Sequence, residues 1–217
     1  MARPATDIES RIVRAARVRF LAEGVDGASL RMIARDAKTN LGMIFYYFPT
    51  KDDLFLAAVD EVYANLVLDL ASALEGGAPL ADRLVCAFTR VGAASDDESQ
   101  VIRLVIRESL LSSTRFDKVF ARARRGHLMM LLRVLAEGVA AGELDGAIPL
   151  PMLLVCTLAL GGLPQLIRRA AGDKPPFSAL PKGAALAKSS VEILLRGAGA
   201  KKAGMATRAG KPKRGLG

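Results

Sequence analysis

The sequence has no tryptophan, one histidine and two cysteines, and aromatic residues make up only 5% of its 217 residues. So few aromatic side chains argue against a β-rich fold, because aromatic residues favour strands. A single histidine leaves no cluster of imidazoles for a metal site. Cys86 and Cys156 form neither a C-x-x-C motif nor a disulfide framework. We expect both cysteines to be small core residues of a protein in a reducing compartment.

The sequence also has little that indicates catalysis. His127 has no obvious nucleophile and carboxylate to work with. No phosphate-binding glycine loop is present, since Gly161 and Gly162 lie within an apolar run. We therefore expect no enzymatic activity, no metal and no cofactor.

Long uninterrupted hydrophobic runs are missing as well. The uncharged stretch 148–163 contains Pro149 and Pro151 and is shorter, between its breaks, than the ~20 residues that a bilayer requires. Arginines interrupt residues 12–21, so the N-terminal region has no signal-peptide core. We expect a cytoplasmic protein without a membrane partner.

What the sequence does contain is hydrophobic helix formers and unevenly placed positive charge. Hydrophobic residues make up 51% of the chain, and the net charge is +9. Residues 197–217 carry six basic and no acidic side chains, and residues 1–51 carry nine basic and five acidic ones. Basic ends on a nearly neutral middle indicate a polyanionic partner, most often nucleic acid. A solvated charged surface is the alternative interpretation.

Apolar periodicity predicts helices throughout and no strands. A capping box at Thr6 begins a first helix that ends at Gly24. Ser29 caps a second helix over 30–37, and a short third helix over 41–47 ends before Pro49. Thr50 caps the fourth helix. The remaining helices are expected at about 51–75, 80–94, 97–112, 115–141, 150–171 and 180–196.

Residues 29–48 have the spacing of a helix-turn-helix, two helices joined by a three-residue turn. Ile44 and Phe48 lie four residues apart and can seat the second helix on the first. The amino end of that second helix has unpaired amides and a partial positive charge, which suits a phosphate edge. Ordinary helical corners share this spacing, so the pair alone is a weak signal.

A longer set of spaced residues is more specific. It comprises Ile12, Ala15, Ala16, Phe20, Gly24, Ser29, Ile33, Ala34 and Ala37, followed by Gly42-x-Ile44-Phe45-Tyr46-Tyr47-Phe48-Pro49-x-Lys51-x-x-Leu54. This set resembles the signature of the TetR/AcrR family of bacterial transcriptional regulators over about residues 8–60. Beyond that range the chain is similar to the family's ligand-binding domain in length and helical content only.

The resemblance implies an all-α fold with a three-helix DNA-binding domain over 1–50 and a helical ligand-binding and dimerisation domain over 51–196. The composition of residues 197–217 predicts a basic disordered tail. The implied function is sequence-specific regulation of transcription, most often as a repressor that leaves a palindromic double-stranded DNA operator when an unidentified small molecule binds. In the family the last two helices form a homodimer, and here their leucines exceed the needs of one core: Leu153, Leu154, Leu158 and Leu163.

The resemblance also implies a set of DNA-contacting residues. Residues at the amino end of the third helix face base edges, the two tyrosines reach the sugar-phosphate backbone, and the basic residues contact phosphate or, for Arg31, a base. The set is Ser29, Arg31, Lys38, Thr39, Asn40, Gly42, Met43, Tyr46, Tyr47 and Lys51. Each also has an ordinary interpretation: helix caps for the serine and asparagine, core positions for the tyrosines, surface charges for the basic residues.

The turn departs from the family pattern. It commonly reads Ala-Gly-Val-Ser, whereas here it reads Ala37-Lys38-Thr39-Asn40. Lys38 occupies a glycine position where a left-handed conformation costs about 1 kcal/mol, and it can add a phosphate contact in return. Thr39 replaces an apolar residue and weakens the seam between the two helices. Phe45 stands where tyrosine is frequent, so one hydroxyl is missing.

A ligand-released regulator needs a cavity, and we expect its walls within residues 97–171. Methionines and leucines give an adaptable apolar lining. The candidate ligand-binding residues are Arg103, Arg107, His127, Met130, Thr157 and Gln165. For the arginines the alternative is a surface position, and for the histidine it is a structural role.

Two other functions stay open from the sequence. A sequence-indifferent nucleic-acid binder driven by the basic ends would lose most of its affinity without residues 197–217. An enzyme or carrier whose N-terminal helices only pack would bind no duplex even at low salt.

Overall fold

The computed structural model describes residues 7–124 and 126–199, and these residues form helices and no strand, which confirms the predicted all-α class. The helices are α1 (Asp7–Gly27), α2 (Leu30–Asp36), α3 (Leu41–Tyr47), α4 (Lys51–Leu74), α5 (Leu80–Gly92), α6 (Asp96–Leu111), α7 (Ser113–Arg124), α8 (His127–Ala140), α9 (Leu150–Ala171), the short 3-10 helix η1 (Phe177–Ala179) and α10 (Ala184–Ala198).

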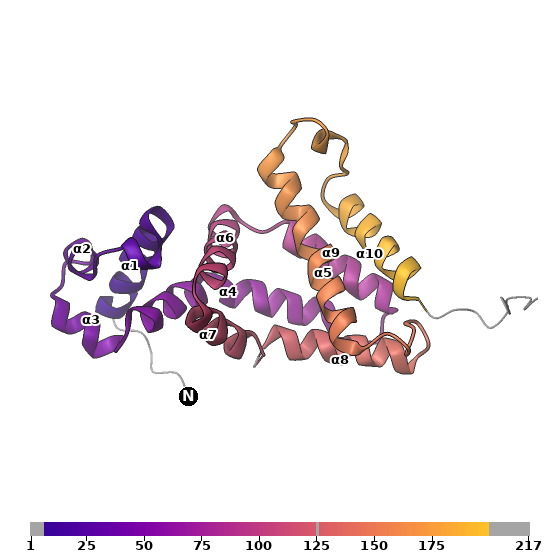
Figure 1. The fold of residues 1–217 in the computed structure, drawn as a ribbon, viewed down its shortest axis with the longest axis horizontal. Helices are drawn as coiled ribbons and strands as arrows, with labels where there is room; N and C mark the ends of the chain where they lie inside the picture. Colours follow the sequence, from indigo (N-terminus) through magenta and orange to yellow (C-terminus); the bar gives the residue numbers. More distant parts are fainter. Residues whose placement is uncertain (1–6, 125, 200–217) are drawn as a thin grey trace, which may run out of the picture.

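The helices form two groups that share α4 (Figure 1). We call α1–α3 the head and α5–α10 the body. Phe20 of α1, Ile33 of α2 and Ile44 of α3 are buried in one hydrophobic cluster with the first turns of α4. The last turn of α4 belongs to a second cluster with α5, α8, α9 and α10. One continuous helix therefore carries apolar contacts from the head into the body.

The first helix bends where the sequence predicts its end. Gly24 has φ 78° and ψ 166°, a left-handed conformation that glycine tolerates because it has no Cβ. The helix resumes beyond it to Gly27, and this extra turn buries Val25 completely. The predicted cap at Thr6 lies outside the described residues.

The single helix predicted over 115–141 was wrong. α7 ends at Arg124 and α8 begins at His127, and Gly126 between them has φ −127° and ψ −118°, far from helical values. The apolar periodicity continues across the break, so the pattern alone does not show it. At the other end of the body, α10 starts at Ala184 and ends at Ala198. Residues 200–217 of the predicted tail lie outside the described residues.

Two expectations about burial were also wrong. Cys86 is exposed and Cys156 is half-buried, so neither is fully enclosed in the core. Leu153 is buried in the second cluster and is not a spare leucine, whereas Leu158 and Leu163 are exposed. α9 is long and apolar enough to span a membrane by length and composition, yet only 22% of its most apolar window is buried within the chain. Much of its apolar surface is therefore left uncovered by residues 7–124 and 126–199.

Head and body meet at a cluster of charges that we call the junction: Asp26 of α1, Asp52 of α4, and the buried Glu108 of α6 and Arg115 of α7. Glu108 is 2% exposed and forms an ion pair with Arg115, whose guanidinium also pairs with Asp26. The Arg115 Nε atom lies 3.4 Å from an Asp52 carboxylate oxygen. Hydrogen bonding to Arg115 holds the pKa of the Asp26 carboxyl below its ordinary value.

The junction also satisfies the backbone of the bent helix. The amide N–H of Val25 donates to Glu108 Oε1 at 3.3 Å. Arg107, beside Glu108, donates from Nη2 to the Phe20 carbonyl oxygen at 3.0 Å. Because a buried charge is costly unless it is paired and hydrogen-bonded, these contacts fix the head against the body in one arrangement.

We predict that Glu108→Gln lowers the free energy of unfolding by about 3 kcal/mol, because it removes the charge that neutralises a buried guanidinium. Urea unfolding followed by far-UV circular dichroism measures the change. Asp117→Asn on the exposed side of α7 is the matched control and should change stability by less than about 0.5 kcal/mol. Equal effects of the two variants would contradict a structural role for the junction.

Candidate nucleic-acid interface and internal cavity

The short helix α3 is held in the head by two apolar side chains. Ile44 and Phe48 are 1% and 6% exposed, which confirms that they seat this helix on its neighbours. Asn40 caps its amino end, with Oδ1 accepting from the Met43 amide N–H at 3.0 Å. Ser29 occupies the N-cap position of α2, but its side chain makes no capping hydrogen bond, so that part of the prediction was wrong.

The residues predicted to contact DNA lie at or near the surface of the head. Ser29, Arg31, Lys38, Asn40 and Gly42 are exposed. Thr39, Met43 and Tyr47 are partly buried. Tyr46 is 66% exposed, and its ring meets that of Tyr47 edge-on with centroids 5.1 Å apart.

Glycine at position 42 keeps the amino end of α3 open. A Cβ atom there would stand 3.2 Å from Asn40 Oδ1, the atom that caps the helix. Any side chain would therefore crowd the cap as well as the space in front of it. The arrangement leaves a bare helix end beside exposed polar side chains, which suits approach to a phosphate or a base edge.

Lys38 has the left-handed conformation that the departure from the family turn predicts. Its φ is 52°, and it is the only non-glycine residue with positive φ in the described part of the chain. This conformation brings the Cβ atom of an L-residue close to its own carbonyl. The turn between α2 and α3 therefore carries strain at an exposed cationic residue.

Lys51 is already engaged in the free protein. Its Nζ donates to the Asp26 carbonyl oxygen at 2.9 Å, so it ties the start of α4 to the end of α1. Thr50 caps α4 in a reciprocal capping box with Asp53, as predicted for the threonine. A phosphate contact by Lys51 would have to share the ammonium with Asp26 or displace that bond.

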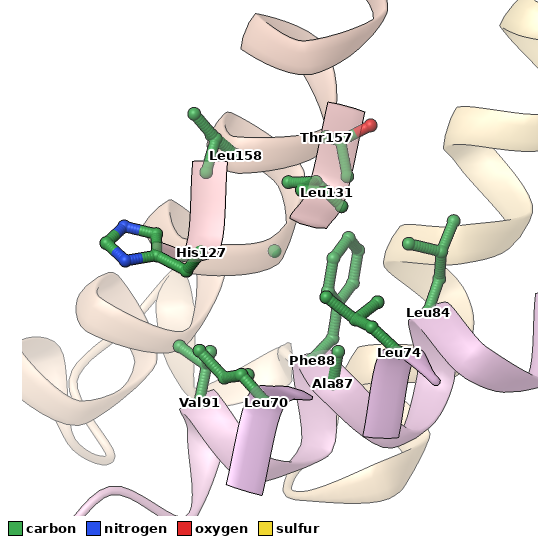
Figure 2. Close-up of a pocket in the computed structure, with 12 residues that line it drawn as sticks. Leu70, Leu74, Leu84, Ala87, Phe88, Val91, His127, Leu131, Thr157 and Leu158 are labelled. Atoms are coloured by element: carbon green, nitrogen blue, oxygen red, sulfur yellow. The ribbon is translucent and has the colours of Figure 1, made fainter. Parts of the chain in front are cut away.

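The body contains a cavity of about 130 Å³ between α4 and α5 on one side and α8 and α9 on the other (Figure 2). α4 and α5 contribute only apolar side chains: Leu70, Leu74, Leu84, Ala87, Phe88 and Val91. α8 and α9 contribute His127, Leu131, Thr157, Leu158, Gly161 and Gly162. Of the six predicted ligand-binding residues, His127 and Thr157 line this space.

The two polar side chains of the cavity differ in what they can offer. The Thr157 hydroxyl donates to the Leu153 carbonyl oxygen at 2.7 Å, and Figure 2 shows that oxygen pointing away from Phe88. His127 lies across the cavity from it, and burial lowers the pKa of its imidazole below the ordinary value. His127 is therefore the one cavity residue with a ring nitrogen donor or acceptor to present.

The other four predicted ligand residues lie elsewhere. Arg103 is exposed, Arg107 bonds to the head, and Met130 packs at the edge of the second cluster. Gln165 lines a smaller space of about 40 Å³ beside the cavity. Its Nε2 atom is buried and has no hydrogen-bond partner among the described residues.

Sequence reasoning missed the contribution of α4 and α5, because it placed the cavity walls within 97–171. One signal was present: Leu80, Leu84, Ala87, Phe88 and Val91 recur at helical spacing, which gives α5 a strongly one-sided apolar face. That face predicts burial. It does not by itself say whether the face meets a packed core or a cavity.

A comparison with known families identifies the head. The family model described as bacterial regulatory proteins, tetR family, matches residues 12–58, from α1 into the first turns of α4. Over this range the chain is similar to the tetR family. This confirms the resemblance noted in the sequence, and the matched range covers the helix-turn-helix and its seat.

Two curated proteins similar to this chain are described as transcriptional repressors. The HTH-type transcriptional repressor NicS of Pseudomonas putida is 39% identical over 67 residues, which is 28% of this chain and 32% of NicS. That match thus spans about a third of the relative. The HTH-type transcriptional repressor SCO4008 of Streptomyces coelicolor is 24% identical over 164 residues, 74% of this chain and 81% of that protein.

Solved structures show the same fold along nearly the whole chain. A regulatory protein of the tetR family from Rhodococcus RHA1 has a TM-score of 0.67 at 21% identity, covering 91% of this chain and 100% of its own. FadR from Bacillus subtilis, solved in complex with stearoyl-CoA, has a TM-score of 0.67 at 18% identity, and the match covers 87% of this chain and 98% of FadR. At these identities the likeness concerns the fold.

Lys38→Gly should raise the free energy of unfolding by about 1 kcal/mol over Lys38→Ala, because both variants lose the charge and only glycine relieves the left-handed strain. Urea unfolding of the two variants measures the difference. A glycine variant no more stable than the alanine variant would contradict the strain.

Acidification should destabilise the wild type more than His127→Gln. The folded-state pKa of His127 lies below its ordinary value of 6.5, so the unfolded chain binds the proton more readily. The contribution of this group to stability is present above about pH 6.5 and declines as the pH falls through the lowered pKa. Urea midpoints at pH 7.5 and pH 5.5 test this. An equal loss in both proteins would contradict it.

Proposed function

We propose that the chain is a transcriptional repressor that binds an operator as a homodimer and releases it when a small molecule enters the body. The observation that carries the proposal is α3 itself, a short helix anchored by Ile44 and Phe48 whose amino end follows a turn with the exposed Lys38. The match of residues 12–58 to the tetR family and the repressor relatives support it.

We assign the DNA contacts to the head in two groups. Lys38, Tyr46 and Tyr47 bind phosphates and set the register, and Ser29 and Lys51 assist at helix starts. Arg31, Thr39, Asn40, Gly42 and Met43 face base edges in the major groove. The residues that position the head thereby differ from those that read the sequence.

The exposed face of α9 and α10 supports a homodimer. Met152, Val155 and Leu163 of α9 and Ile193 of α10 are all more than half exposed in the single chain. Contiguous apolar surface of this kind marks an interaction site. Binding to a palindrome requires a second copy, related by a two-fold axis, whose recognition helix lies one DNA turn from the first, ~34 Å.

A second copy suits this face better than a bilayer does. α9 ends in Arg168 and Arg169, which bond to Asp173 and to Asp96 of α6, so that end of the helix is tied to the protein. Thr157 and Gln165 are buried against the body on its other side. We place the protein in the cytoplasm on this basis.

Release follows from the position of α4. Its last turns line the cavity through Leu70 and Leu74, while its first turns hold the head through Leu54 and Phe55. A ligand that moves the last turns moves the first, because a helix transmits displacement along its axis. The spacing of two heads on DNA then changes, and affinity falls. The stearoyl-CoA complex of FadR is consistent with a ligand in a body of this fold.

The test is a selection from a random duplex pool with the full chain, followed by gel retardation of the enriched sequence. We expect a palindrome. Arg31→Ala should weaken binding to it about 5- to 150-fold, the range of one bidentate base contact. Tyr46→Phe should cost about 5-fold, the value of one hydrogen bond.

Arg133→Ala on α8 is the control for Arg31→Ala, since it removes the same charge at an exposed site in the body. It should leave operator affinity within about 2-fold. A pool without enrichment, or a strictly monomeric protein, would rule the repressor out. Loss of most affinity on deletion of residues 197–217, with all duplexes competing equally, would instead support a sequence-indifferent binder.

A further inference from the structure

The lining of the body cavity is chemically uniform. Of the described residues 7–124 and 126–199, those that line it include no Asp, Glu, Lys or Arg. Thr157 presents little polarity, because its hydroxyl is bonded to the backbone of its own helix. A charged ligand group buried there would find no opposite charge, which makes its transfer from water very costly.

Charged residues near the cavity are already committed to other partners. Arg169, which lines the adjoining smaller space, bonds to Ser99 Oγ at 2.6 Å and to Asp96 at 2.9 Å. Arg107, the other predicted anchor, lies away from the cavity, where it bonds to the Phe20 carbonyl oxygen and to Glu108. Neither guanidinium is available as an anchor for a carboxylate or phosphate in the cavity.

The size of the cavity limits the ligand further. Its volume is about 130 Å³, and an apolar cavity of ~150 Å³ in another protein holds a benzene molecule. Drug-sized ligands occupy sites of roughly 300–1,000 Å³. The cavity is partly open, so a single ring can fill it with one or two small substituents at its mouth, whereas most of a long acyl chain or a nucleotide would lie outside it.

His127 offers one polar contact at the edge of the cavity. The His127 imidazole is half-buried at the edge of the cavity opposite Thr157, and Figure 2 shows its ring turned away from Phe88 and Leu131. No hydrogen bond competes for it among the described contacts, and a neutral imidazole has one N–H donor and one acceptor nitrogen. Rotation of this side chain toward the cavity would let it pair with one hydroxyl or carbonyl group of a ligand whose body fills the apolar space.

We propose that the effector is an uncharged monocyclic molecule of the size of a substituted phenol, with its ring between Phe88 and Leu131 and its one polar group at His127. This inference rests on the proposed release of the operator by a ligand, and it names the class of that ligand. It differs in class from the acyl-CoA in the solved FadR complex.

The probes are p-cresol, toluene, 4-methylbenzoate and stearoyl-CoA, each titrated into the full chain by calorimetry and checked by thermal shift. We expect p-cresol to bind, toluene to bind about 2- to 10-fold more weakly for want of one hydrogen bond, and 4-methylbenzoate to bind at least about 100-fold more weakly than p-cresol. Binding of the benzoate or of stearoyl-CoA as tightly as p-cresol would overturn the proposal, as would failure of all four to bind.

Two helical glycines provide a matched pair of variants, Gly161 in the cavity lining and Gly197 in α10 away from it. A Cβ at Gly161 would stand 2.5 Å from the Phe88 ring, whereas one at Gly197 would meet nothing within 4 Å. Gly161→Ala should push the ring into the cavity and weaken p-cresol binding at least about 10-fold, and Gly197→Ala should stay within about 3-fold. Equal effects would place the ligand elsewhere.

A third variant keeps the test independent of packing at position 161. His127→Leu should bind toluene as the wild type does and should lose the preference for p-cresol over toluene. A preference that survives this substitution would overturn the role of His127.

Operator retardation without ligand separates this proposal from the proposed function. A chain that retards its operator and ignores p-cresol leaves the repressor intact and the ligand class wrong. A chain that binds p-cresol and enriches no duplex leaves the ligand class intact and the repressor wrong. Release of the operator by p-cresol, and not by 4-methylbenzoate, would support both.

Discussion

The structure depends on keeping one carboxylate paired. Glu108 is almost completely buried, and its charge is held by Arg115 and by the Val25 amide, which belongs to a helix more than eighty residues earlier in the chain. A buried charge without partners is so unfavourable that the helices supplying those partners cannot separate freely. Head and body are therefore joined by a polar junction with one favourable arrangement and not only by apolar surface, which slides more easily.

Because of that junction, α4 can transmit a displacement from the cavity to the head. α4 holds the head at one end and lines the cavity at the other, and Asp52 in its first turn approaches Arg115. A change at the cavity can therefore reach the head along a single element whose two ends are both constrained. Close-packed interiors transmit such displacements because they deform little. The same geometry explains why the cavity is lined on one side by α4 and α5.

The apolar surface of α9 gives the second constraint. One side of this helix is buried against the body through Leu153 and Thr157, and the other leaves large apolar side chains exposed. A helix apolar on both sides is stable in water only when something covers the second side. Two-fold pairing is the simplest cover, because it brings identical surfaces together. Under that proposal, the cavity, helix α4 and the symmetry axis lie in one connected part of the molecule.

Local interactions determined what the sequence alone could predict. The apolar stripe of α1, the seat of α3 through Ile44 and Phe48 and the Thr50 cap each involve residues a few positions apart, so their spacing carries the information. The left-handed Lys38 was expected from the resemblance, because the family has glycine at that position. Only the tertiary structure decided the break at Gly126, the exposure of Cys86, the partners of Glu108 and the cavity walls in α4 and α5. Those features depend on which distant helices meet, and helical periodicity shows that a face is buried without showing what buries it.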